Sequence, residues 1–231
     1  MSDFDLIIYD CDGTLTDTET LYAQVTCELL HDNGLSMYTP EKCLESFQGK
    51  TWAAIRNKIE SDHDIKLCDD IVERYAEQAK IKLEKSLQPV AGALELLQST
   101  SETHEICVGS NGERSNVLAS LYQLDFVSFF TEEKIYTKCQ VENGKPEPDL
   151  FLYAAEKMGH TPERTLVIED SVPGVHAGVA AGMHVIGFTG SAHDVTVAES
   201  RLKEAGAHTI MQELIHIIPW LKSQKTFDKS A

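Results

Sequence analysis

Two aspartates one residue apart follow a short apolar run near the start of the chain. The run is Leu6–Tyr9, and the polar residues after it include Asp10, Asp12, Gly13 and Thr14. Side chains two positions apart on an extended strand point the same way, so the two carboxylates can converge on one small volume. Two carboxylates so near each other need a proton or a cation between them. Mg²⁺ is a suitable cation because it prefers oxygen ligands. The spacing is typical of a cation site that handles phosphate, although Asp-x-Asp alone leaves open a solvated acidic turn.

A serine and a lysine farther along the chain could supply groups that bind phosphate. Ser110 opens the turn Ser110-Asn111-Gly112 directly after an apolar segment, where its hydroxyl and the turn amides could hold phosphate oxygens. Lys145 is followed by prolines at 146 and 148, which stiffen the backbone beside a cation. Each residue also has an ordinary interpretation, because Ser110 could cap a helix and Lys145 could be a solvated surface lysine.

A second pair of acidic residues ends another apolar run. Glu169 and Asp170 come directly after Leu166-Val167-Ile168 and before Ser171. Paired carboxylates at the end of a strand could complete a Mg²⁺ site. The alternative is that Asp170 or Ser171 caps the helix that follows.

Alternating apolar segments predict the elements that must position these residues. We expect strands at 6–9, 104–109, 166–168 and 184–187, and helices at 93–98, 113–124, 172–181, 195–205 and 211–221. Strands separated by helices predict an α/β fold with a parallel sheet, in which reactive groups lie at the carboxyl ends of the strands. The four polar motifs are therefore expected at one edge of the sheet or in its adjoining loops.

The segment between the first two strands has a different pattern. Helical spacing, Pro40 at a helix start and caps near Thr51 and Asp70 predict four helices and no convincing strand. We therefore expect two domains: an α/β core formed by residues 1–16 and 87–231, and a helical domain formed by residues 17–86.

The composition of the chain argues against several classes of partner. The 231 residues include 20 basic and 37 acidic side chains, and the net charge of −17 argues against a nucleic acid partner. No apolar run approaches the roughly 20 residues of a membrane helix, and the N-terminus lacks the basic region of a signal peptide. The six cysteines form no C-x-x-C pair, which is typical of reduced thiols. We expect a cytoplasmic protein that binds no membrane.

In this order, the four motifs resemble those of the haloacid dehalogenase-like phosphohydrolase superfamily, in its subfamily with a helical cap. The most specific matches are Tyr9–Leu15 and Glu169–Gly174, and the resemblance spans nearly the whole chain. The chain looks closest to the bacterial sugar-phosphate phosphatases, near the β-phosphoglucomutases. The resemblance implies a Rossmann-like core with an inserted cap, and hydrolysis of a sugar phosphate or a sugar-acid phosphate such as 6-phosphogluconate.

The resemblance also implies a role for each motif residue. Asp10 is expected to attack phosphorus and become a transient aspartyl phosphate, while Asp12 serves as general acid and base. The residues expected to bind phosphate are Thr14, Ser110, Asn111 and Lys145. The residues expected at the Mg²⁺ site are Asp10, Asp12, Asp170 and Glu169. Asp12 would contribute its backbone carbonyl, and Glu169 would be either a direct ligand or a support for the others.

The resemblance implies a small phosphorylated metabolite as the partner, with the cap determining which metabolite binds. It also implies that the protein is a monomer or a weak dimer. The cap residues expected to contact the substrate are Thr18, Tyr22, Gly49, Lys50 and Trp52. The turn at 48–51 resembles the substrate loop of the family, although an ordinary interhelix turn is an open alternative. Trp52 fits a core position better than a sugar platform.

Two other functions are compatible with the same motifs. A phosphosugar mutase would use the same aspartyl phosphate, but Tyr22 stands where the mutases of this family carry a histidine, which favours hydrolysis. A non-catalytic binding protein on the same fold would be expected to have lost one of the motif residues, and all are present.

Overall fold

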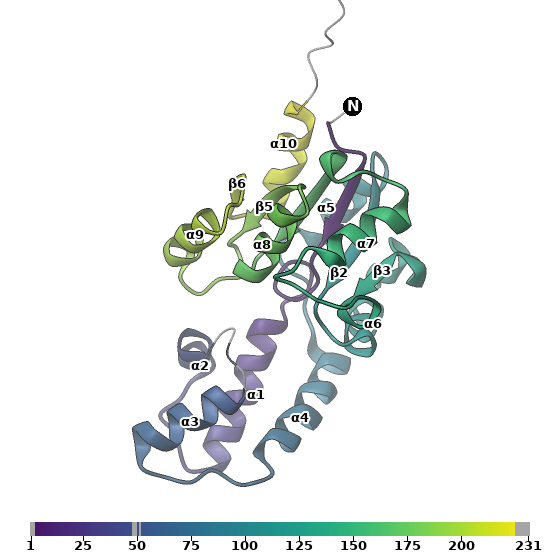
Figure 1. Cartoon of the computed structure of the whole chain (residues 1–231). Coiled ribbons are helices and arrows are strands. Elements are labelled where there is room, and N and C mark those ends of the chain that lie inside the picture. The colour runs from purple at the N-terminus through teal and green to yellow at the C-terminus, as the bar shows by residue number, and fades with distance from the viewer. Residues whose placement is uncertain (1–2, 48–49, 51, 225–231) are drawn as a thin grey trace, which may run out of the picture. The chain divides into compact units, whose positions relative to one another are not determined.

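A computed structural model describes residues 3–47, 50 and 52–224 of the chain (Figure 1). Contacts between Cα atoms divide the chain into two units. The first is formed by Met1–Asp17 and Gln88–Ala231, and the second, the helical unit, by Thr18–Leu87.

The first unit is built on a six-stranded parallel sheet with the strand order β3-β2-β1-β4-β5-β6. The strands are β1 (Leu6–Tyr9), β2 (Glu105–Ser110), β3 (Ile135–Thr137), β4 (Thr165–Glu169), β5 (His184–Phe188) and β6 (Thr209–Met211). The predicted α/β fold with a parallel sheet and a helical insertion is confirmed.

The register of the sheet brings the polar motifs to the same level. β1 lies between β2 and β4, and Tyr9 is paired with Val108 on one side and with Ile168 on the other. The amide of Asp10 donates to the carbonyl of Ile168 at 3.0 Å, so the residue after β1 is still held against β4. Because the strands are parallel, the residues that follow them lie at one edge of the sheet.

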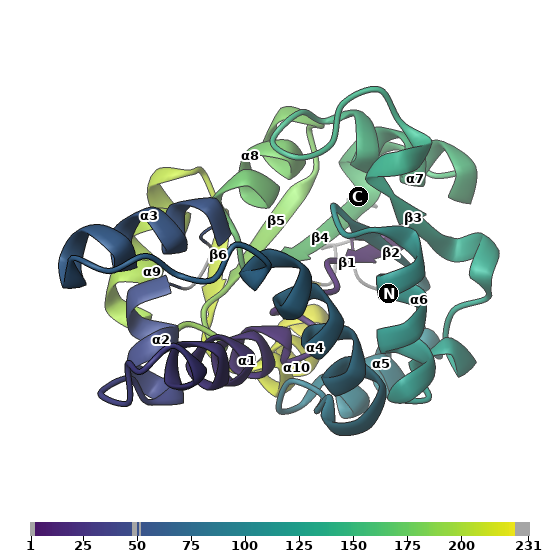
Figure 2. The same cartoon turned by 90° about the horizontal axis from the view of Figure 1, so that it is seen from below.

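Helices cover both faces of the sheet (Figure 2), which explains why its strands are apolar throughout. Alternate residues of β1 serve different faces: Ile7 and Tyr9 pack with one group of helices, and Leu6 and Ile8 with the other. The first group is α5 (Ala93–Ser101), α6 (Arg114–Gln123) and α10 (Ile217–Ser223). The second group is α7 (Asp149–Met158), α8 (Val172–Ala180) and α9 (Val195–Glu204).

Part of the core differs from the prediction. β3, β6 and α7 were not predicted, and the helix predicted to start at Met211 begins only at Ile217. Met211 is instead the last residue of β6, which pairs with β5, and a short 3₁₀ turn at Leu214–His216 precedes α10. Strands of three residues are too short for an alternating pattern to identify them.

The helical unit contains α1 (Thr18–Asp32), α2 (Pro40–Phe47), α3 (Trp52–His63) and α4 (Ile71–Ser86), with no strand among its described residues. α1 packs against α2 and α4, and it buries residues such as Leu21, Val25 and Leu29 at helical spacing. Within the described part of the chain, no helix is long and apolar enough to cross a membrane.

Candidate active site

A lysine bridges two carboxylates at the carboxyl edge of the sheet. The Lys145 Nζ lies 2.5 Å from the Asp10 Oδ1 and 2.6 Å from the Glu169 Oε1. The side chains of Lys145, Asp10 and Glu169 are only 3%, 9% and 1% exposed. The structure thus joins the residue after β1, the last residue of β4 and the loop before α7 in one buried ionic cluster.

The cluster holds one positive and two potential negative charges away from water. Burial raises the pKa of Asp10, with Lys145 opposing the rise and Glu169 and Asp12 adding to it. Burial by itself lowers the pKa of Lys145, but the carboxylates of Asp10 and Glu169 more than reverse this and hold it above its usual range. Lys145 is therefore an ammonium at any physiological pH, held between two carboxyl groups.

Asn111 holds the lysine in place through the backbone. Its side-chain Nδ2 donates to the Lys145 carbonyl at 2.9 Å, and its Oδ1 accepts from the Lys145 amide at 2.9 Å. The lysine chain then runs past the ring of Phe151, whose centroid is 4.8 Å from Nζ. The sequence suggested phosphate binding for Asn111. It could not indicate this pair of hydrogen bonds, because Lys145 lies 34 residues farther along the chain.

Glu169 uses both carboxylate oxygens within the protein. Its Oε1 contacts Lys145, and its Oε2 accepts from the Ser171 amide at 2.7 Å and the Ser171 hydroxyl at 2.9 Å. The Ser171 hydroxyl also accepts from the Gly174 amide at 3.1 Å, which caps the start of α8. A Cβ at Gly174 would collide with the Glu169 carboxylate, so the backbone of α8 closes directly over it. These contacts favour Glu169 as a support for Lys145 over a direct metal ligand.

The loop after β1 lies against Asp170. Gly13 has a φ of +82°, and a Cβ there would meet the Asp170 carboxylate, so only glycine permits this approach. The hydroxyl of Thr14 is fully buried and donates to the Asp170 Oδ1 at 3.2 Å. Thr14 therefore orients a carboxylate, and phosphate binding by Thr14 stays a prediction.

Ser110 and Asp12 both lie beside Gly112, in the turn after β2. The Gly112 amide donates to the Ser110 Oγ at 2.9 Å. A Cβ at Gly112 would lie 3.2 Å from both the Ser110 Oγ and the Asp12 Oδ2. Ser110 is buried and Asp12 is partly exposed, so the turn places a hydroxyl and the second aspartate beside the ionic cluster.

The donor set fits a hard divalent cation that keeps water ligands. Residues 3–47, 50 and 52–224 contain no group of three His, Cys, Asp or Glu side chains arranged to hold a metal. Mg²⁺ does not need such a group, because it is usually bound by one or two carboxylates together with waters and substrate phosphate. Asp10 and Asp170, with the Asp12 carbonyl, offer that kind of set.

The predicted cap residues all belong to the helical unit. The Thr18 hydroxyl is buried and has no hydrogen-bond partner among the described residues. Tyr22 lies with its ring centroid 6.0 Å from that of Tyr75, and the Lys50 Nζ donates to the Ser46 carbonyl at 2.6 Å. Gly49 lies outside the described residues. Trp52 is buried against Tyr75, with ring centroids 5.0 Å apart.

Comparison with protein-family models matches residues 7–188 to the family described as haloacid dehalogenase-like hydrolase. The 6-phosphogluconate phosphatase of Escherichia coli (strain K12) is 28% identical over 204 residues, which cover 87% of this chain and 90% of that protein. The phosphorylated carbohydrates phosphatase of Thermotoga maritima is 26% identical over 218 residues, which cover 92% of this chain and 97% of that protein.

A solved structure is similar along its whole length. It is a HAD family hydrolase from Deinococcus radiodurans R1 with bound phosphate and sodium. It is 27% identical to the chain, the match covers 97% of each chain, and the TM-score is 0.87.

Proposed function

Because the chain belongs to the haloacid dehalogenase-like hydrolase family, we propose that it hydrolyses a carbohydrate phosphate through an aspartyl phosphate on Asp10, with Mg²⁺ as cofactor. The chain is a phosphoric monoester hydrolase that acts on phosphorylated sugars. The observation that carries the mechanism is the buried cluster in which Lys145 bridges Asp10 and Glu169 at the edge of the sheet.

In the first half of the reaction, the Asp10 carboxylate attacks phosphorus. The bond from phosphorus to the Asp10 oxygen forms as the bond to the sugar oxygen breaks, and Asp12 gives its proton to the leaving alkoxide. In the second half, Asp12 takes a proton from water, and the water oxygen attacks the same phosphorus. Inorganic phosphate leaves and the Asp10 carboxylate is restored.

Positive charge at contact distance stabilises the transferring phosphoryl group. Asn111 holds the backbone of Lys145 through two hydrogen bonds, and Glu169 contacts its ammonium group. Together with the Ser110 hydroxyl, it would bind the phosphoryl oxygens in a site with little screening by solvent. Such local charge offsets the long-range repulsion that a net charge of −17 exerts on an anionic substrate.

Mg²⁺ would be held by the carboxylates of Asp10 and Asp170 and by the Asp12 carbonyl. When bound, it supplies further positive charge to the phosphoryl oxygens. Thr14 orients Asp170 through its hydrogen bond, and Gly13 lets the loop after β1 approach that carboxylate.

The substrate is a phosphorylated sugar or sugar acid, and 6-phosphogluconate is the specific candidate. Two of the relatives, at 28% and 26% identity, are named as phosphatases of 6-phosphogluconate and of phosphorylated carbohydrates. We further propose that Thr18, Tyr22 and Lys50 of the helical unit take part in selecting among substrates.

Phosphate release from a panel of substrates tests this function. The panel holds sugar phosphates, sugar-acid phosphates, phosphoglycolate and nucleotides, each with Mg²⁺ and with EDTA. We expect Mg²⁺-dependent release that is fastest for a phosphorylated carbohydrate. Isomer interconversion stimulated by a bisphosphate, with little free phosphate, would instead identify a mutase, and no reaction from folded protein would contradict both.

A further inference from the structure

An aromatic ring lies beside the ammonium group of Lys145. The Lys145 Nζ lies over the ring of Phe151, 4.8 Å from its centroid. Phe151 belongs to the first turn of α7, and its side chain is fully buried. Because the Lys145 side chain is only 3% exposed, the contact between the cation and the ring is shielded from water.

The sheet holds the ring in place. Phe151 packs with Ile8 and Val167 in the apolar layer on one face of the sheet. A Cβ at Gly109 of β2 would lie 3.1 Å from the Phe151 Cε1, which is closer than ordinary van der Waals contact. Glycine at that position therefore leaves the room that the ring occupies, and the packed ring offers a fixed surface to the lysine.

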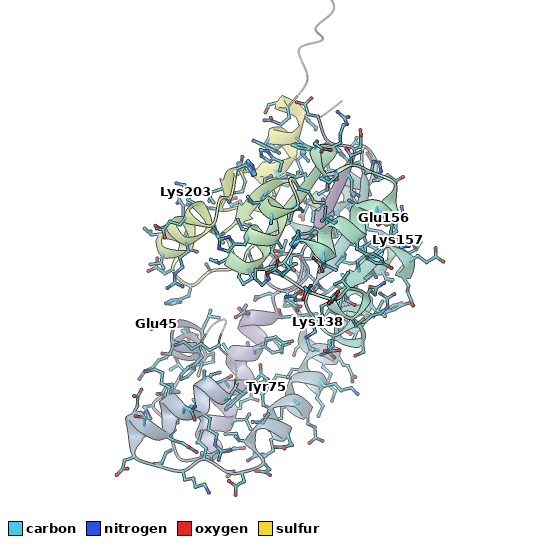
Figure 3. All side chains as sticks on the ribbon, viewed as in Figure 1. Glu45, Tyr75, Lys138, Glu156, Lys157 and Lys203 are labelled. Atoms are coloured by element: carbon cyan, nitrogen blue, oxygen red, sulfur yellow. The ribbon has the colours of Figure 1, made fainter. Side chains whose placement is uncertain are left out.

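The contact differs from two others of the same kind among the described residues. Lys157 lies 5.3 Å from the centroid of the Tyr153 ring (Figure 3), and Lys42 lies 4.9 Å from that of Tyr38. Both of these lysines are exposed, so water also solvates their charge. A cation is held more strongly by a ring when neither is hydrated, as at Lys145.

The ring attracts the ammonium group without using up its hydrogen-bond donors. A lysine ammonium has three N–H donors. Among the described residues, its acceptors are the Asp10 Oδ1 and the Glu169 Oε1, which account for two of them. An oxygen in place of the ring would accept the third, whereas the negative face of an aromatic ring attracts the charge as a whole. One N–H is thus left for an oxygen of a bound phosphoryl group.

We propose that Phe151 is a positioning residue for phosphoryl transfer, and that the face of its ring holds the Lys145 ammonium with one N–H directed to a phosphoryl oxygen. Phe151 acts through Lys145 and takes no part in the chemistry itself. The proposal rests on the proposed function, because the phosphoryl group is the acceptor of that N–H.

Fluorination of the ring tests its electrostatic role without removing it. Each fluorine withdraws electrons from the face of the ring and weakens its attraction for a cation, while the ring nearly keeps its size. We would place phenylalanine with one, two or three ring fluorines at position 151 of the full chain and measure phosphate release with Mg²⁺. We expect kcat to fall stepwise, by about tenfold with three fluorines, and KM to change less.

The same substitutions at Phe126 provide a matched control. Phe126 is 2% exposed, and its ring lies edge-on to that of Phe129 with centroids 6.4 Å apart. Fluorination there should leave kcat unchanged, and circular dichroism would verify that each protein is folded. A constant kcat across the series at position 151, or equal falls in the two series, would show that the ring contributes packing alone and would overturn the proposal.

Nuclear magnetic resonance of the lysine ammonium groups tests the contact independently of activity. An aromatic ring shields nuclei above its face, so the Lys145 ammonium protons should move downfield in Phe151→Leu. Their signal is identified by its absence in Lys145→Ala.

These measurements separate the failure of this proposal from that of the proposed function. Phosphate release that is insensitive to fluorine at position 151 overturns only the role of Phe151. No release by folded wild type overturns the phosphatase, and the ammonium signal then decides on the contact alone. A downfield shift in Phe151→Leu supports the contact, and an unchanged signal overturns it.

Discussion

At the scale of single residues, the site depends on Lys145. Its ammonium contacts both Asp10 and Glu169, and all three side chains are nearly excluded from water. The attraction between such charges is stronger in a buried site than at the surface because solvent screens it little, and the loss of their hydration opposes it. A single cation thus holds two carboxyl groups together at the place where a phosphoryl group would bind.

Replacing that lysine should abolish most of the activity. Lys145→Ala removes the cation that neutralises the phosphoryl oxygens, and we expect kcat to fall by about 100-fold or more. Lys138→Ala removes a half-exposed lysine that lies 3.5 Å from Glu113 (Figure 3), and its kcat should stay near the wild-type value. Equal rates for Lys145→Ala and wild type in a phosphate-release assay would rule out this role for the lysine.

At the scale of elements, the start of α8 positions Glu169. The helix begins at Val172, is capped by the Ser171 side chain, and brings Gly174 against the Glu169 carboxylate. The cap and the glycine thus fix the side chain that orients Lys145.

A methyl group on α8 should disturb this arrangement. Gly174→Ala places its Cβ against the Glu169 carboxylate, and we expect a loss of about 1–3 kcal/mol in the free energy of unfolding and a lower kcat. His176→Ala alters an exposed residue two positions along the same helix, and it should change neither quantity. Urea unfolding and phosphate release measure the two effects, and a Gly174→Ala protein as stable and active as wild type would contradict them.

The elements also show which parts of the fold could be predicted from the sequence. β1, β2, β4 and β5 were predicted because each is an apolar run followed by polar residues. β3 and β6 have only three residues, and Met211 was assigned to a helix because β6 is recognisable only through its pairing with β5. The residues of a three-residue strand do not by themselves indicate which strand it pairs with.

The candidate site was predictable to a similar extent. Asp10, Ser110 and Glu169 could be singled out from their residue types and positions after apolar runs, and Lys145 from the prolines that follow it. Two sets of hydrogen bonds could not be predicted: those from the Asn111 side chain to the Lys145 backbone, and that from Thr14 to Asp170. Each depends on a contact between loops far apart in the chain.

At the scale of the whole molecule, cation binding should stabilise the fold. A ligand that binds only the folded state adds about 2.7 kcal/mol at 100 times its Kd. We therefore expect Mg²⁺ to raise the Tm and EDTA to reverse the rise. Asp170→Asn should abolish the shift, whereas Asp149→Asn, at the start of α7, should retain it. A wild-type Tm that is the same with and without Mg²⁺ would contradict the proposed metal site.

Stability should also fall in mildly acidic solution because the imidazole ring of His184 is partly buried. Burial lowers the pKa of His184, and His208, stacked on it at 4.5 Å, lowers it further. The unfolded chain then binds a proton near pH 6.5 that the folded chain does not, so stability decreases as pH falls below about 6.5. The drop in Tm between pH 7.5 and 5.5 should be smaller in His184→Phe, and an equal drop in both proteins would exclude His184 as a cause.

The central claim is that Asp10 carries the phosphoryl group during turnover. The most direct measurement is rapid acid quenching during hydrolysis of a sugar phosphate, followed by borohydride reduction and mass spectrometry of the peptide containing Asp10. We predict reduction at Asp10 in wild type and in Asp12→Asn, where slower hydrolysis should increase the trapped fraction, and none in Asp10→Asn. Phosphate release by Asp10→Asn at the wild-type rate, or reduction at another carboxylate, would contradict the account.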